Sequence, residues 1–136
     1  MKALNILLIE DDMIEVMKLN RTISSLKLNH KIVEANNGEE ALKILEKKDE
    51  LPDIILLDLN MPKINGIEFL SILKKDAILK YIPTIILTTS NNQKDLLECY
   101  KIGIAGYILK PLKYEDYVLK IEKLLAYWSI NELKQL

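Results

Sequence analysis

The sequence predicts an α/β protein in which five parallel strands form a doubly wound sheet with helices on both faces. The first observation is a set of short apolar runs rich in Ile and Leu, which suit strands buried on both faces. The second is a helical pattern after each run, so that strand and helix alternate five times along the 136 residues. Strict alternation of this kind implies parallel strands joined by right-handed crossovers.

The expected strands are short and nearly all apolar. The chain has only four glycines and four prolines, so the ends of the apolar runs are sharply marked. The runs cover residues 4–9, 30–35, 54–57, 84–88 and 107–109.

The expected helices follow from apolar residues at helical spacing. Asp12 is a candidate N-cap for the first helix and Asn37 for the second, where Glu39 and Glu40 suit the positive end of the helix dipole. The five units use residues 1–128, so we expect one domain, a short tail at residues 129–136 and no output domain. The apolar stripes are Val16, Leu19, Ile23 and Leu26; Ala41, Leu42 and Leu45; Ile67, Leu70 and Leu73; Leu96, Leu97 and Tyr100; and Tyr117, Ile121, Leu124 and Trp128.

Composition excludes several classes of function. The 19 basic residues nearly cancel the 20 acidic ones, and Arg21 is the only arginine, which argues against a nucleic-acid partner. No apolar run is long enough for a signal peptide or a membrane span, so we expect no membrane partner. The single cysteine, Cys99, cannot form an internal disulfide, which fits a cytoplasmic location.

Chemically active side chains gather at the ends of the expected strands. In open parallel sheets, sites form outside the carboxyl ends of the strands, so these side chains should meet at one edge. The residues are Glu10, Asp11 and Asp12 after the first strand, Asp58 after the third, Thr88, Thr89 and Ser90 at the fourth, and Lys110 and Pro111 at the fifth.

The carboxylates among them predict a cation site. Glu10, Asp11 and Asp58 would repel one another unless a cation neutralised them, and oxygen-only ligands favour Mg²⁺. A carboxylate beside Mg²⁺ and a lysine can attack a phosphoryl group and form an aspartyl phosphate. Asp11 with Mg²⁺, Lys110 and Thr88 would supply the groups that such a product needs.

Four motifs in order resemble the receiver domain of two-component response regulators. They are Glu10-Asp11-Asp12; Asp58-Leu59-Asn60-Met61-Pro62 with Gly66; Leu87-Thr88-Thr89-Ser90; and Gly106-Tyr107-Ile108-Leu109-Lys110-Pro111. The resemblance extends from Ala3 to about Leu125. It implies the flavodoxin-like receiver fold, whose strand order is 2-1-3-4-5.

This resemblance implies a role for each matching residue. Asp58 would accept phosphate from a phosphohistidine, so the partner would be a sensor histidine kinase or a phosphotransfer protein. Asp11 would bind Mg²⁺ directly, Glu10 would bind it through water, and the backbone carbonyl of Asn60 would complete the protein ligands. The protein would act as a switch that alters protein–protein binding, with only self-phosphotransfer and autodephosphorylation chemistry.

The remaining implied roles concern the switch. Lys110 would pair with the phosphoryl oxygens, and Pro111 would follow a cis peptide bond that fixes the approach of the lysine. Thr88 would be the switch hydroxyl and Tyr107 the switch aromatic. The chain departs from the family at Glu10, where Asp is frequent, and at Thr89, where a smaller residue is usual.

The C-terminal aromatic residues leave two interpretations open. Trp128 either extends the core stripe of the fifth helix or, with Tyr127, exposes an aromatic patch for a partner. Together with the segment around Tyr100, these residues resemble stand-alone receivers that work with phytochrome-like sensor kinases. Some of those dimerise through the fourth helix, fifth strand and fifth helix, so the resemblance makes that face a candidate surface for a homodimer.

Other interpretations fit the sequence less well. A haloacid-dehalogenase-type phosphatase would need a DxD motif and a cap insertion, and a pseudo-receiver would lack one of the acids, the lysine or the hydroxyl. A receiver cut from a longer kinase or transcription factor is a further alternative. His30 is expected to be solvated, and Cys99 to be a half-buried structural thiol.

Overall fold

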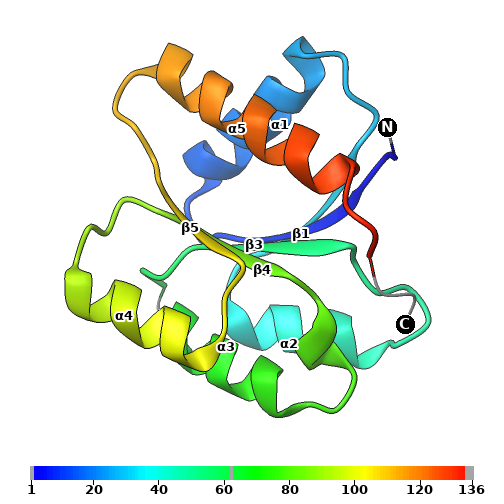
Figure 1. Ribbon diagram of the computed structural model, residues 1–136, viewed down its shortest axis with the longest axis vertical. Helices are drawn as coiled ribbons and strands as arrows, with labels where there is room; N and C mark the ends of the chain where they lie inside the picture. Colours follow the sequence, from blue (N-terminus) through cyan, green and yellow to red (C-terminus); the bar gives the residue numbers. More distant parts are fainter. Residues whose placement is uncertain (1, 62, 134–136) are drawn as a thin grey trace.

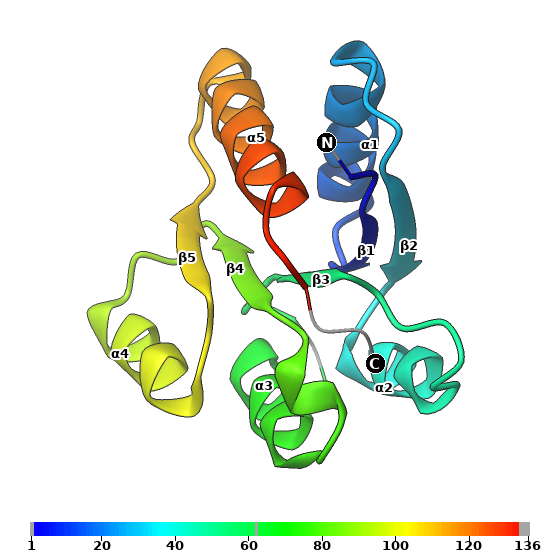
Figure 2. The ribbon, with the colours of Figure 1, turned by 45° about the vertical axis from the view of Figure 1, so that its right-hand side comes forward.

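The computed structural model describes residues 2–61 and 63–133. Five parallel strands form one sheet in the order β2-β1-β3-β4-β5, which confirms the predicted fold class (Figures 1 and 2). Each expected strand is present, and its first residue differs from the predicted one by at most one position. The bounds are Asn5–Ile9 for β1, Lys31–Ala35 for β2, Ile54–Leu57 for β3, Thr84–Thr88 for β4 and Gly106–Leu109 for β5.

Within the described residues, five α-helices alternate with the strands, and a 3-10 turn, η1 (Leu79–Tyr81), precedes β4. Figure 1 shows α1 and α5 on one face of the sheet and α2, α3 and α4 on the other. The predicted caps are confirmed, since Asp12 accepts a hydrogen bond from the Ile14 N–H at 2.9 Å and Asn37 accepts one from the Glu40 N–H at 2.8 Å. The bounds are Met13–Ser25 for α1, Gly38–Glu46 for α2, Gly66–Lys75 for α3, Gln93–Ile102 for α4 and Tyr114–Ser129 for α5.

Alternation along the central strands divides the core into two layers. In β1, Leu7 and Ile9 pack among the apolar residues of α2 and α3, whereas Ile6 and Leu8 pack among those of α1 and α5. All residues of β3 and β4 are buried, while β2 at one edge exposes most of its length. The buried centre of the sheet therefore holds the carboxyl ends of β1, β3 and β4 side by side.

Helix α4 differs from the sequence prediction. Leu97 and Tyr100 of its expected apolar stripe are about half exposed, and the buried residue is Cys99. The helix lies at the edge of the sheet and packs with its Cys99 side, so the stripe faces outward instead. Cys99 is fully buried rather than half-buried, and burial raises the pKa of its thiol to about 11, as expected for a structural thiol.

The tail expected at residues 129–136 overlaps α5 by one residue, because this helix continues through Ser129. The Ser129 carbonyl accepts a hydrogen bond from the Lys2 N–H at 3.3 Å, and Leu133 packs against the α1 and α5 layer of the core. The last part of the expected tail, residues 134–136, lies outside the described residues. Among the helices of the described part, none has the length and apolar character needed to cross a membrane.

Candidate functional site

Three carboxylates meet at the carboxyl ends of β1 and β3. These strands are neighbours in register, with Ile9 beside Leu57, so the residues that follow them are brought together. Glu10, Asp11 and Asp58 each offer an oxygen atom, and these oxygens all lie within 4.8 Å of one another. The structure thus places together the acids that the sequence predicted would meet.

Two of the three acids are buried where the sheet holds their backbone. The Glu10 N–H donates to the Ala35 carbonyl at 3.0 Å, and the Asp58 N–H donates to the Ile9 carbonyl at 3.1 Å. The side chains of Glu10 and Asp58 are almost inaccessible, while Asp11 is exposed. Burial raises the pKa of Glu10 to about 7; Lys110 opposes this rise, and the charge of Asp58 adds to it. Crowded oxygen ligands of this kind suit a hard divalent cation that can replace the missing counter-charge.

Lys110 supplies the one ammonium group that faces these acids among the described residues. Its Nζ lies 2.5 Å from Oε1 of Glu10 and 3.0 Å from Oε1 of Glu15, and its side chain is 6% exposed. Burial by itself would lower the pKa of Lys110, but the hydrogen bonds to the two glutamates, together with the charges of Glu10 and Asp58, outweigh it and raise the pKa. The backbone N–H of Lys110 donates to the Thr88 carbonyl at 2.8 Å, which extends the pairing of β4 and β5 and fixes the lysine at this edge.

Glu15 is a residue of the site that the sequence prediction missed. It lies in the first turn of α1, which starts at the same edge of the sheet. Its position four residues after Asp11 was the available signal, because a helix that begins at a strand end returns its first turn toward that end. The sequence pattern assigned this helix only its apolar stripe.

Thr88 and Tyr107 are connected through the backbone of Ser90. The buried Thr88 hydroxyl oxygen accepts a hydrogen bond from the Ser90 N–H at 3.3 Å. The Tyr107 hydroxyl donates to the Ser90 carbonyl at 2.8 Å. The two residues expected to form a switch therefore contact opposite sides of one residue of the β4–α4 loop.

The loop after Asp58 is fixed by a close approach of Gly66. A Cβ atom at Gly66 would lie 2.7 Å from the Asp58 carbonyl oxygen and 2.7 Å from the Leu59 Cα. The Gly66 N–H donates to the Leu59 carbonyl at 3.2 Å, and Asn65 forms a capping box with Glu68 at the start of α3. The exposed Asn60 lies on this loop, two residues after Asp58, and Pro62 lies outside the described residues.

The expected cis peptide bond before Pro111 is wrong for this structure. No peptide bond of the described residues is cis. A trans bond is the lower-energy form even before proline, and with it the Lys110 ammonium already reaches Glu10. The approach of the lysine is set by its pairing with β4 and by its carboxylate partners.

The aromatic residues expected at an interface surround a groove beside β5. Tyr127 is exposed, whereas Trp128 is half-buried, packs against the core and meets Tyr127 edge-to-face at 5.2 Å. The groove has a volume of about 600 Å³, and Ile108 and Leu124 contribute to its apolar lining. Trp128 combines the two interpretations left open by the sequence, because it contacts the core and also lines the groove. Tyr100 is exposed on α4.

Polar residues at the amino end of β1 have a different role. Asp53 accepts a hydrogen bond from the Asn5 N–H at 2.8 Å and lies 3.3 Å from the Lys2 ammonium. His30, which is only partly buried, accepts one from the Leu4 N–H at 2.9 Å through Nδ1, so it has a structural role that the sequence did not indicate. Both residues satisfy backbone groups at the start of the sheet.

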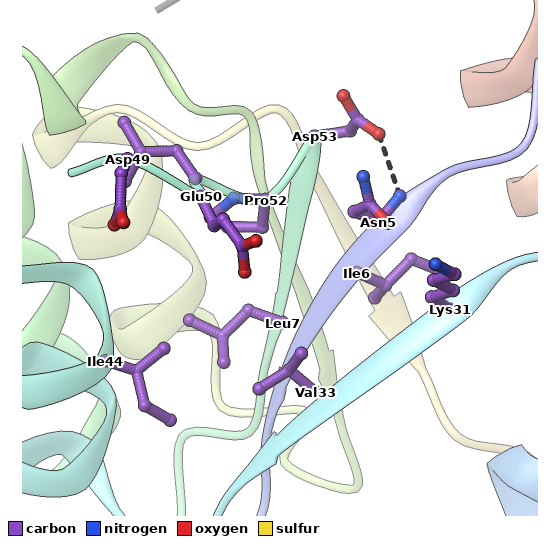
Figure 3. A pocket seen from close by; sticks show the side chains of 11 residues that line it. Asn5, Ile6, Leu7, Lys31, Val33, Ile44, Asp49, Glu50, Pro52 and Asp53 are labelled. Carbon is purple, nitrogen blue, oxygen red and sulfur yellow. Dashed lines mark hydrogen bonds between the residues drawn. The ribbon is translucent and has the colours of Figure 1, made fainter. Parts of the chain in front are cut away.

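The second hollow of the surface lies at this amino end. Figure 3 shows it between α2 and the strands, with Ile44, Leu7 and Val33 on one side and Pro52 and Asp53 on the other. Its volume is about 480 Å³. Because it lies at the opposite end of β1 from Glu10 and Asp11, it is separate from the acidic cluster.

The fold and the site together define a doubly wound α/β protein with buried acids and a lysine at its carboxyl edge. A family model, the response regulator receiver domain, matches residues 6–122. The chain therefore belongs to the family of response regulator receiver domains.

Individual relatives agree with this assignment. The chain is 35% identical over 127 residues to the probable methanogenesis regulatory protein FilR2 of Methanothrix harundinacea, covering 90% of this chain and 82% of that protein. It is 30% identical over 128 residues to the response regulator Rcp1 of Synechocystis, covering 90% and 87%. The phosphorylated cyanobacterial phytochrome response regulator RcpA superimposes with a TM-score of 0.91 at 29% identity, covering 98% of this chain and all of that one (100%). The Mn²⁺-bound form of Rcp1 gives a TM-score of 0.88 at 28% identity, with 97% and 99% covered.

Proposed function

We propose that this protein is a single-domain response regulator that accepts a phosphoryl group on Asp58. The observation that carries the proposal is the buried Asp58 carboxylate, which shares one edge of the sheet with Glu10, Asp11 and the Lys110 ammonium. The donor is a phosphohistidine of a sensor histidine kinase or a phosphotransfer protein. A carboxylate oxygen of Asp58 forms a bond to phosphorus, the phosphorus–nitrogen bond breaks, and the histidine nitrogen keeps the electron pair.

The acidic cluster fits Mg²⁺ as the cofactor. Its donors are carboxylate oxygens, with no His or Cys among the cluster members, and their mutual repulsion requires a cation. Asp11, Asp58 and the Asn60 carbonyl would hold the ion, and Glu10 would hold it through water. When bound, Mg²⁺ neutralises charge on the acids and on the incoming phosphoryl group.

The protein side chains stabilise the product and report its presence. Lys110 has three N–H donors, so one can reach a phosphoryl oxygen. The Thr88 hydroxyl, at the end of β4, donates to another phosphoryl oxygen and releases its hydrogen bond from the Ser90 N–H. Because Tyr107 binds the Ser90 carbonyl, movement of this loop shifts the population of Tyr107 conformations and the shape of the α4, β5 and α5 surface.

Apolar side chains around the mouth of the site support a protein donor. Met13, Ile14 and Met17 of α1 are more than half exposed, and Leu112, two residues after Lys110, is completely exposed. All four lie on segments that follow the carboxyl ends of β1 and β5. Exposed apolar side chains close to a site are typical of a protein-binding surface.

The groove between β5 and α5 supports a homodimer as the second partner. The exposed Tyr127 and the half-buried Trp128 border its apolar lining, and Lys120 and Lys123 lie beside them. Tyr100 extends the exposed aromatic surface to α4. The large share of FilR2 and Rcp1 that this chain covers, 82% and 87%, supports a stand-alone protein of similar size. We propose that it is a cytoplasmic switch that acts by binding and not as an enzyme on other substrates.

Phosphorylation of Asp58 is tested with Mg²⁺ and acetyl phosphate. We expect the intact protein to gain one base-labile phosphate, as measured by intact-mass spectrometry, and Asp58→Asn to gain none. Asp53→Asn is the matched control, because it makes the same change at the opposite end of the sheet. Equal labelling of wild type and Asp58→Asn would contradict the proposal.

The switch is tested with beryllofluoride, an analogue of the phosphoryl group. We expect light scattering to show more dimer after activation of the wild type, and Thr88→Ala and Tyr107→Phe to reduce this gain. A wild type that stays monomeric at high concentration in both states would refute dimerisation but leave the phosphoacceptor role intact.

A further inference from the structure

We infer that Glu15 is a positioning residue for Lys110, which holds the lysine ammonium away from Asp58 until the site is phosphorylated. The inference rests on the proposed function, in which Lys110 must pair with a phosphoryl group on Asp58. Neither the acidic cluster nor the matched motifs include Glu15.

The lysine is bound to the glutamates and not to the phosphoacceptor. Its Nζ lies 2.5 Å from Glu10 and 3.0 Å from Glu15, and no ion pair of the described residues joins it to Asp58 within 4.0 Å. A phosphoryl oxygen on Asp58 would have to compete with these two carboxylates for the ammonium. The glutamates therefore stabilise the inactive position of the lysine.

Glu15 is itself held in place from α1 and α5. Its second carboxylate oxygen, Oε2, faces the Lys18 ammonium at 3.7 Å, one helical turn further along α1. The Lys18 Nζ in turn lies 4.3 Å from the centre of the Tyr117 ring on α5. Glu15 also lies in the first turn of α1, where a negative charge suits the helix dipole. The position of Glu15 thus depends on helix packing rather than on the strand ends.

The two glutamates respond differently to a divalent cation. Glu10 is a member of the acidic cluster, so a cation bound there would compete with the lysine for its carboxylate. Glu15 lies outside that cluster and keeps its charge directed at Lys110. In the protein with Mg²⁺ bound, Glu15 is the carboxylate that competes with the phosphoryl group for the lysine.

The pair is sheltered enough for this competition to be measurable. The side chains of Lys110 and Glu15 are 6% and 20% exposed, so solvent and salt screen their attraction only weakly. Replacing Glu15 with the isosteric Gln removes the charge and keeps the shape. The freed lysine should then favour the active position.

The test compares Glu15→Gln with wild type at saturating Mg²⁺, using beryllofluoride as the probe. We expect the variant to bind beryllofluoride roughly threefold to tenfold more tightly, as for the loss of one partly sheltered ion pair. The ¹⁵Nζ chemical shift of Lys110 should differ between variant and wild type before beryllofluoride is added and coincide afterwards. A general effect on folding would not produce this pattern.

Matched variants separate the contact from a general change in charge. Glu122→Gln removes the same charge from an exposed position of α5 and should leave beryllofluoride affinity unchanged. Lys18→Gln removes the second partner of Glu15 while Glu15 stays charged, so it should give no gain. Glu15→Asp, which keeps the charge but shortens the reach, should give a smaller gain and provides a second variant if Glu15→Gln folds poorly.

The outcomes distinguish this inference from the function on which it rests. Calorimetry first confirms that Glu15→Gln is saturated with Mg²⁺ as the wild type is. If the variant then binds beryllofluoride no more tightly than the wild type, the role of Glu15 is overturned. A wild type that fails to bind beryllofluoride would overturn the phosphoacceptor proposal instead.

Discussion

The amino end of β1 and its carboxyl end both carry acidic and basic side chains. At the amino end, Asp53 accepts a hydrogen bond from the Asn5 N–H and lies beside Lys2, so its charge is matched and its role is structural. At the carboxyl end, Glu10 and Asp58 are buried together, and the nearby ammonium group lies against Glu10.

This difference separates structural from functional polar groups. A polar side chain that satisfies a backbone donor stabilises the fold by about 1 kcal/mol. Like charges crowded into a buried site lower stability until a ligand neutralises them, which is typical of functional sites. The comparison therefore predicts that equivalent substitutions at the two ends change stability in different ways.

The largest expected effect is at Gly66, which packs against the backbone of the Asp58 loop. Gly66→Ala places a Cβ 2.7 Å from the Asp58 carbonyl oxygen, so we expect a loss of about 2–3 kcal/mol in the free energy of unfolding. Gly106→Ala, at the amino end of β5, meets only the Ile85 Cγ2 at 3.8 Å and should change stability by less than about 0.5 kcal/mol. Urea unfolding measures both, and equal losses would show that the Asp58 loop is not tightly held.

Neutralising one acid at each end should give effects of opposite sign. Without divalent cations, Asp58→Asn removes a crowded buried charge and should raise the free energy of unfolding by about 1–2 kcal/mol. Asp53→Asn weakens the acceptor for the Asn5 N–H and the pair with Lys2, and should lower it by about 1 kcal/mol.

Mg²⁺ extends this test to the function of the acids. Saturating Mg²⁺ should raise the melting temperature of wild type and of Asp53→Asn, and raise that of Asp58→Asn less, because a ligand stabilises only the state that binds it. If Asp58→Asn and Asp53→Asn lowered the free energy of unfolding by similar amounts without cation, the two ends of β1 would not differ in the way proposed.

Much of the fold and site could be predicted from sequence because local signals agree with the global arrangement. The apolar runs locate the strands, Asp12 and Asn37 cap the helices as expected, and the strand ends bring Glu10, Asp11 and Asp58 together. These predictions depend only on residue type and position along an element.

The parts that failed depend on packing between elements. Whether Cys99 or Tyr100 of α4 faces the core is decided by how the helix lies on the sheet edge, which periodicity over a short helix does not determine. The contact of Glu15 with Lys110 joins α1 to the end of β5, so the position of Glu15 in the first turn of α1 does not by itself identify its partner. The peptide bond before Pro111 was expected to be cis only because the family has that feature, and it is not cis here.

The smallest effect concerns pH, because the two ends titrate in opposite directions. Burial lowers the pKa of His30 below its usual 6.5, and its Nδ1 accepts the Leu4 N–H only while the ring is neutral. The unfolded chain therefore takes up this proton first as pH falls, so the contribution of His30 is present above pH 6.5 and is lost below it. Glu10 acts with the opposite sign, because its raised pKa of about 7 means that the folded protein binds a proton before the unfolded chain does, and stability falls as pH rises toward 7.

Comparing wild type with His30→Ala isolates the amino end, since the Glu10 contribution is common to both proteins. At pH 8 the variant should be less stable by about 1 kcal/mol, the usual value of one hydrogen bond. Because His30 is the only histidine, this difference should shrink as pH is lowered through 6.5 and below, in urea unfolding measured without divalent cations. A difference that stays constant over this range would mean that the Leu4 N–H does not depend on a neutral imidazole, and His30 would then contribute to the fold through packing alone.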